Sequence, residues 1–153
     1  MPNLSMLPLT GTLVGLATQT ASGTSGALQI PNASSYRFVV QTNTVSGTSP
    51  TLQIILATSF DGGTTYNEFL SFANLTTTGV GRQLTWRPYL IGGDLATSAI
   101  CGNLGVTDMA AGDVAINGPI NPALIKVRWV LTGTSPSFAF QVQYAAVPQN
   151  LHE

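Results

Sequence analysis

The feature of this sequence that most limits its possible folds is its scarcity of charged side chains. Over 153 residues, Lys and Arg together number five and Asp and Glu six, so only 7% of the chain is charged, against about 25% in typical soluble domains. The polar surface must come instead from Thr, Ser, Asn and Gln, which occur 20, 12, 9 and 8 times. Thr favours strands, whereas Lys and Glu, which usually form exposed helix faces, are nearly missing. The composition therefore favours an all-β protein.

The size and charge of the chain indicate one domain that works among partners. We expect a single domain over residues 1–153, because this length can bury a core and 44% of the residues are hydrophobic. A net charge of −1 with few charges of either sign promotes association. Five scattered basic residues neutralise few phosphates, so nucleic-acid binding is not expected. No apolar run reaches the roughly 18 residues of a membrane span.

Alternating apolar residues predict a series of strands separated by turn sequences. Residues 52–59 are almost continuously apolar, which indicates a strand covered on both faces. Residues 1–27 read as an extended arm with a short strand near 11–17, and residues 92–122 as a long glycine-rich connection with a short strand near 114–116. The other expected strands are residues 36–45, 66–75, a strand through Leu84 and Trp86, 125–131 and 138–144. This pattern predicts an antiparallel β-sandwich, either jelly-roll-like or immunoglobulin-like.

The sequence also contains a short internal repeat. The tetrapeptide Gly-Thr-Ser-Pro occurs at residues 47–50 and again at 133–136, an offset of 86 residues. The same offset places Leu52 on Phe138 and Ile54 on Phe140. We interpret the two segments as equivalent hairpins, one in each layer of a sandwich; chance recurrence of common turn residues is the alternative.

No arrangement of side chains in the sequence predicts catalysis. The only histidine, His152, lies near the end of the sequence, where it is expected to be solvated rather than to serve as a base. The internal carboxylates form no pair of evident purpose for glycoside hydrolysis, and Asp61 is explained by its Asp-Gly turn. The remaining internal carboxylates are Glu68, Asp94, Asp108 and Asp113.

Metal and cofactor binding are not expected either. Asp108, Asp113 and Asn103 could supply oxygen ligands to calcium, but their spacing is not that of an EF-hand loop. The single cysteine, Cys101, excludes an internal disulfide and reads as a buried apolar residue or a free thiol.

Aromatic and arginine side chains are the remaining candidates for contact with partners. Trp129 alternates in register with apolar residues and is expected in the core, and core packing is also the better interpretation of Trp86. Arg87 and Tyr89, beside a proline and a glycine-rich stretch, are the predicted interface residues.

Three segments together carry a resemblance to a known family. They are the Gly-Thr-Ser-Pro turn at residues 47–50, Ser-Phe-Asp-Gly-Gly-Thr-Thr-Tyr at 59–66, and the strand and turn at 125–136. The combination resembles small β-sandwich virion proteins of tailed bacteriophages, particularly head decoration (cement) proteins, over roughly residues 36–75 and 122–147. Tail, neck and fibre proteins share similar segments.

The resemblance implies a structural role without catalytic residues or cofactors. Such proteins lie over junctions between capsid subunits, often as trimers, and stabilise the head by adding contact area. The implied partners are the major capsid protein and further copies of the chain, which would form a homotrimer. The implied location is the capsid surface of the virion, and the host cytoplasm before assembly. A carbohydrate-binding module using Trp86 or Tyr89, and a hydrolase, are the competing hypotheses.

Overall fold

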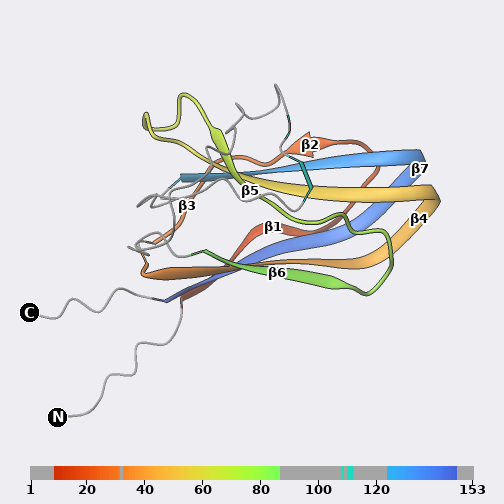
Figure 1. Ribbon diagram of the computed structural model, residues 1–153, viewed down its shortest axis with the longest axis horizontal. Helices are drawn as coiled ribbons and strands as arrows, with labels where there is room; N and C mark the ends of the chain where they lie inside the picture. The colour runs from red at the N-terminus through yellow and green to blue at the C-terminus, as the bar shows by residue number, and fades with distance from the viewer. Residues whose placement is uncertain (1–8, 32, 87–107, 109, 112–123, 148–153) are drawn as a thin grey trace, which may run out of the picture.

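The computed structural model describes residues 9–31, 33–86, 108, 110–111 and 124–147. Within these ranges every regular element is a β-strand, and the strands form one antiparallel sheet (Figure 1). The strands are β1 (Leu9–Gln19), β2 (Gly23–Thr24), β3 (Leu28–Gln29), β4 (Ser35–Thr58), β5 (Asn67–Ser71), β6 (Gly81–Trp86) and β7 (Leu124–Val147). The predicted all-β fold class is confirmed.

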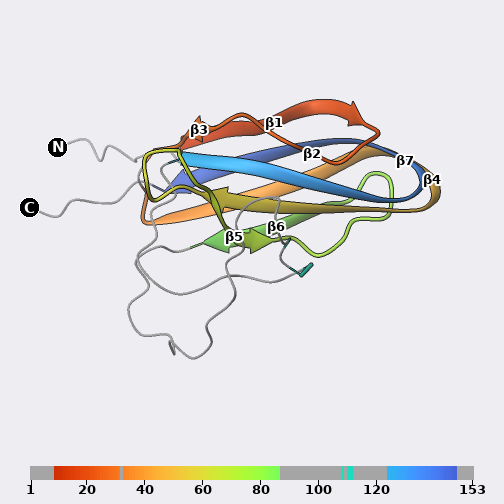
Figure 2. The same cartoon turned by 90° about the horizontal axis from the view of Figure 1, so that it is seen from above.

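The two longest strands, β4 and β7, pair with each other from end to end. Ser35 lies opposite Val147 at one end of this ribbon, and Thr58 lies opposite Ile125 at the other. Near its middle the ribbon bends back on itself at residues 47–50 and 133–136, which we call the corner. The bend separates a first limb (residues 35–46 and 137–147) from a second limb (residues 51–58 and 124–132), and the limbs lie one over the other (Figures 1 and 2).

The corner is built from the two copies of Gly-Thr-Ser-Pro, which face each other with Thr48 opposite Thr134. Their backbones match, because φ is +116° at Gly47 and +108° at Gly133, while Ser49 and Ser135 have φ of +49° and +48°. A Cβ atom on Gly47 would lie 2.7 Å from the carbonyl oxygen of Ser135. Glycine is required at Gly47 and Gly133 both for its conformation and for the close approach of the facing strand.

The two turns are equivalent, as predicted, but the prediction that each turn joins a hairpin is wrong. Residues 36–45 do not form a hairpin with residues 52–59, and residues 125–131 do not pair with 138–144. Instead each segment pairs with the other strand of the ribbon, as Val40 does with Val142 and Leu56 with Val127. The physical reason is that β4 and β7 bend at the same place. Each bend carries its strand from the first limb into the second, and the two strands remain paired with each other.

The hydrophobic core lies between the limbs. Alternate residues of each limb point inward, and aromatic rings meet across the gap. The ring centroids of Phe38 and Phe69 are 6.2 Å apart, and those of Trp129 and Phe140 are 5.9 Å apart. Full burial of each large apolar side chain contributes about 1.5–3 kcal/mol. The fully buried core residues include Tyr36, Phe38, Val40, Leu52, Ile54, Leu56, Val127, Phe138, Phe140 and Val142.

Shorter strands extend the ribbon on both sides. β6 pairs with β4 in the first limb and β5 pairs with β4 in the second. On the other side β1 pairs with β7 in the first limb, and β2 and β3 pair with β7 in the second. The predicted short strand near residues 11–17 is thus confirmed and is longer than expected, whereas the expected strand near residues 114–116 lies outside the described residues.

Glycines let the N-terminal strands approach aromatic rings of β7. The ring of Tyr144 covers Gly11 and that of Trp129 covers Gly23, so closely that a Cβ atom at either glycine would overlap the ring. The indole Nε1 of Trp129 also donates a hydrogen bond to the carbonyl oxygen of Ala21 at 3.1 Å. Trp129 packs against the core as predicted.

Replacing either corner glycine by alanine is expected to destabilise the fold by about 1–3 kcal/mol, because a residue with a Cβ atom is strained at this φ. Gly47→Ala and Gly133→Ala should have similar effects in urea unfolding. Gly26→Ala is the matched control, since no atom lies within 4 Å of its added Cβ, and its effect should stay within about 0.5 kcal/mol. A large loss from only one corner variant would contradict the equivalence of the two turns.

Candidate assembly interface

Most of the side chains singled out in the sequence fall outside the described residues. Arg87 and Tyr89, the predicted interface residues, are among them. So is the side chain of Trp86, although its backbone lies in β6 and pairs with Tyr36 of β4. Also outside the described residues are Asp94, Cys101, Asn103, Asp113 and His152. The candidates that the structure places are Asp61, Glu68 and Asp108.

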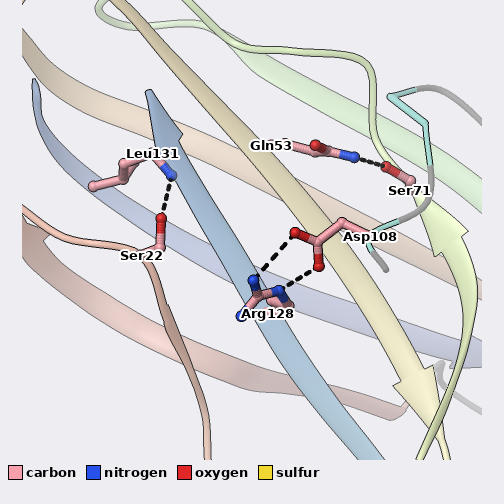
Figure 3. Close-up of polar contacts among 6 residues, drawn as sticks. All are labelled: Ser22, Gln53, Ser71, Asp108, Arg128 and Leu131. Atoms are coloured by element: carbon pink, nitrogen blue, oxygen red, sulfur yellow. Dashed lines mark hydrogen bonds and ion pairs between the residues drawn. The ribbon is translucent and has the colours of Figure 1, made fainter. Parts of the chain in front are cut away.

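Charged side chains gather on the outer face of the second limb, opposite the core. Arg128 of β7 donates hydrogen bonds to both carboxylate oxygens of Asp108, at 2.5 Å from Nε and 3.1 Å from Nη2 (Figure 3). Glu68 and Lys126 lie in one row across Ala57, and the ammonium of Lys126 lies 4.3 Å from the centroid of the Tyr66 ring. This face therefore holds both signs of charge close together.

Burial makes these charges depend on one another. Glu68 has no exposed surface, and neither do Ile55 and Ala57, which point to the same side. The pKa of Arg128 is raised above its ordinary value, first by its hydrogen bonds to Asp108 and then by attraction to the carboxylates of Asp108 and Glu68, while burial acts in the opposite sense. Beside them Gln53 donates a hydrogen bond to the Ser71 hydroxyl at 2.9 Å (Figure 3). A buried charge needs a partner of opposite charge or a hydrogen bond. We therefore interpret these side chains as a charge network that stabilises the fold.

The residues between β4 and β5 form a turn organised by Asp61. Its carboxylate accepts hydrogen bonds from the Ser59 hydroxyl, from the backbone N–H groups of Thr64 and Thr65, and from the Thr65 hydroxyl. These donors hold the pKa of Asp61 well below its ordinary value, chiefly through the Thr65 hydroxyl. The turn fixes the backbone next to Phe60, whose side chain is 64% exposed. The sequence interpretation of Asp61 as a turn residue is confirmed.

The outer face of the first limb has a different character. Its cross-strand rows bring together amide and hydroxyl side chains, and Gln141 donates a hydrogen bond to Gln41 at 3.0 Å. Within the strands of this limb the only charge on the face is Arg37. The polar residues of the face include Gln41, Gln83, Thr85, Gln141 and Gln143. This surface is polar enough to be wetted and carries no carboxylate to repel another protein.

Strand β1 forms the border of that face. It pairs with β7 on one side, and no strand among the described residues pairs with its other side. Its eleven residues include no charge and no proline, which are two of the common protections of an open edge against pairing. Leu9 and Leu16 are 49% and 53% exposed. An edge of this kind is a template for pairing with another chain.

Other features offer less. A shallow pocket of about 240 Å³ lies beside β6, where Arg82 donates to the carbonyl oxygen of Asn74 at 3.3 Å, but its polar walls are exposed rather than desolvated. The described part of the chain contains no group of three or more His, Cys, Asp or Glu side chains suited to a metal ion. It also contains no helix long and apolar enough to cross a membrane.

Sequence reasoning did not find the two surfaces that the structure brings out. The pairing of Arg128 with Asp108 joins residues on separate segments and leaves no local pattern. The open edge of β1 does have a sequence pattern. Residues 1–36 contain no charged side chain, and this uncharged stretch could have indicated an edge strand without charges.

Removing the Arg128 guanidinium is expected to destabilise the protein by about 1–2 kcal/mol at pH 7, because Asp108 and the buried Glu68 lose their neighbouring positive charge; partial exposure limits the loss. Arg128→Gln should lower the urea midpoint accordingly. Arg37→Gln, which removes an exposed Arg from the other limb, should change the stability by less than about 0.5 kcal/mol. Equal effects of the two variants would refute a structural role for this network.

The Asp61 turn predicts a pH effect. Since the pKa is lower in the folded chain, the carboxylate contributes stability above its unfolded pKa of about 4, and this contribution is lost as the pH falls through the folded pKa. Thr65→Val should raise the pKa of Asp61 toward its ordinary value in a carboxyl-carbon NMR titration. Thr64→Val should leave it unchanged, because Thr64 reaches the carboxylate only through its backbone N–H, at 3.0 Å. Equal shifts in both variants would show that the Thr65 hydroxyl is not the main cause.

Comparisons of the chain with protein-family models, with curated proteins and with solved structures find no match. Its function has to be inferred from its own surfaces: the edge of β1, which has no charge or proline, the face beside that edge, where the first limb carries only Arg37 as a charge, and a covered charge network on the other limb.

Proposed function

We propose that this chain is a structural subunit of a virus-like particle, and specifically a decoration protein on the head of a tailed bacteriophage. The observation that carries the proposal is the long open edge of β1, which has no charge or proline to guard it. On a free monomer such an edge invites uncontrolled pairing. On a subunit held in a particle, neighbouring chains cover it.

The proposed mechanism is the addition of contact area between capsid subunits. The partners are the major capsid protein and further copies of this chain, which the family resemblance suggests form a trimer on the capsid surface. A standard interface buries about 1,600 Å² in total, and repetition over a shell multiplies its effect. Scarce charge supports this role, because few charges must be stripped of water when such surfaces meet. The proposal involves no catalysis and no cofactor.

The proposed fold is an antiparallel β-sandwich. Its layers are the two limbs with their flanking strands: β1 and β6 beside the first limb, and β2, β3 and β5 beside the second. The ring contacts between Phe38 and Phe69 and between Trp129 and Phe140 support two layers packed face to face.

A place in the tail, neck or fibre is the second candidate, because those proteins share the turn segments that carry the resemblance. Copy number distinguishes the two. A decoration protein covers a whole shell, whereas neck and tail positions follow the low symmetry of the tail axis.

Quantitative mass spectrometry of purified particles is expected to find hundreds of copies of the chain per particle. Particles stripped of the chain should lose their DNA at a lower temperature than intact ones, and adding the purified chain back should restore the difference. A count near six or twelve would place the chain in the neck or tail, and its absence from particles would refute the structural role.

A further inference from the structure

We infer that the free edge of β1 docks against the same edge of a second copy, so that two first limbs join antiparallel across a two-fold axis. The inference rests on the proposed role as an assembled subunit and adds a two-fold contact between copies, separate from the contacts within the proposed trimer. An interface of this type is isologous, because each strand supplies the same residues to the other.

Among the borders of the described sheet, β1 is the one suited to pairing. β2 and β3 have two residues each, and β5 has five. β6 is also a border, but it carries Arg82, and a charged side chain is a common guard. β1 is eleven residues long and carries no charged side chain and no proline.

The irregularities of β1 favour its own copy over an unrelated strand. Its register against β7 shifts between Thr12 and Val14 and again between Val14 and Ala17. Regular stretches therefore lie at residues 9–12 and 17–19, on either side of a bulged centre at Val14, which is also the middle of the strand. In an antiparallel pair centred there, each regular stretch faces the other one and the two bulges meet. This approximate symmetry of β1 about Val14 favours a second copy of the same strand as its partner.

The side chains of β1 suit pairing with themselves. Thr10, Thr12 and Thr18 are exposed and lie opposite Ala145, Gln143 and Ala139 of β7. Threonine pairs across strands are favourable, whereas like charges opposite each other are unfavourable. No charged residue occurs in residues 9–31, so two copies of this edge bring no like charges together. The pairing would also cover Leu9 and Leu16, which are about half exposed in the single chain.

The test uses charge on the edge and its compensation in a mixture. One variant carries Thr10→Lys, Thr12→Lys and Thr18→Lys, and a second carries Glu at the same three positions. Light scattering after size-exclusion chromatography at low salt should show that the wild type forms dimers. The association constant should fall at least tenfold for each variant. An equimolar mixture of the two variants should restore association, whatever the register of the pair, and added salt should weaken it.

The control variant carries Thr48→Lys, Thr64→Lys and Thr76→Lys, which add the same charge at exposed positions away from β1. It should associate like the wild type, and thermal unfolding should show that all variants are folded. A monomeric wild type, self-association of the β1 variants at wild-type strength, or a mixture that stays monomeric would overturn the inference. A wild-type trimer that persists in the β1 variants would overturn it and leave the proposed function standing. Absence of the chain from purified particles, while the β1 dimer still forms in solution, would overturn the proposed function alone.

Discussion

The paired corner at residues 47–50 and 133–136 is the constraint on which the rest of the structure depends. Because β4 and β7 bend at the same place, neither strand changes its partner when it passes from one limb to the other. The two strands therefore stay paired in both limbs, with register shifts only near the corner, and buried residues of both limbs belong to one core. The two glycines make this possible, since a side chain at either would collide with the facing backbone.

The outer faces of the two limbs differ because the few charged side chains are unevenly distributed between them. On the second limb Arg128, Asp108, Glu68 and Lys126 share one covered face, where partial burial strengthens their interactions. On the first limb the outer face is built from amides and hydroxyls and ends at an edge without charge. Charge thus stabilises the second limb, while the outer face of the first limb carries a single charge, Arg37, within its strands.

The sequence predicted the strands well and their partners poorly. Alternation at residues 36–45 and 125–131, and continuous apolarity at 52–59, report the environment of each strand, and the structure agrees with them: Ile54, Ile55 and Leu56 are fully buried. Pairing depends instead on contacts between distant segments, and a turn sequence such as Gly-Thr-Ser-Pro looks the same in a hairpin as in a corner. The Asp61 turn was predictable because all of its donors lie within four residues. The ion pair of Arg128 with Asp108 was not, because it depends on how a separate segment is placed.

The separation of β4 from β7 in the sequence has a consequence for how the chain acquires its shape. The central ribbon joins residues 35–58 to residues 124–147, so no part of it can close until the later segment has been synthesised. Until then the apolar stretch at residues 52–58 has no partner strand from β7, and pairings between such distant segments form slowly. The nascent chain therefore exposes this apolar stretch to aggregation during that interval.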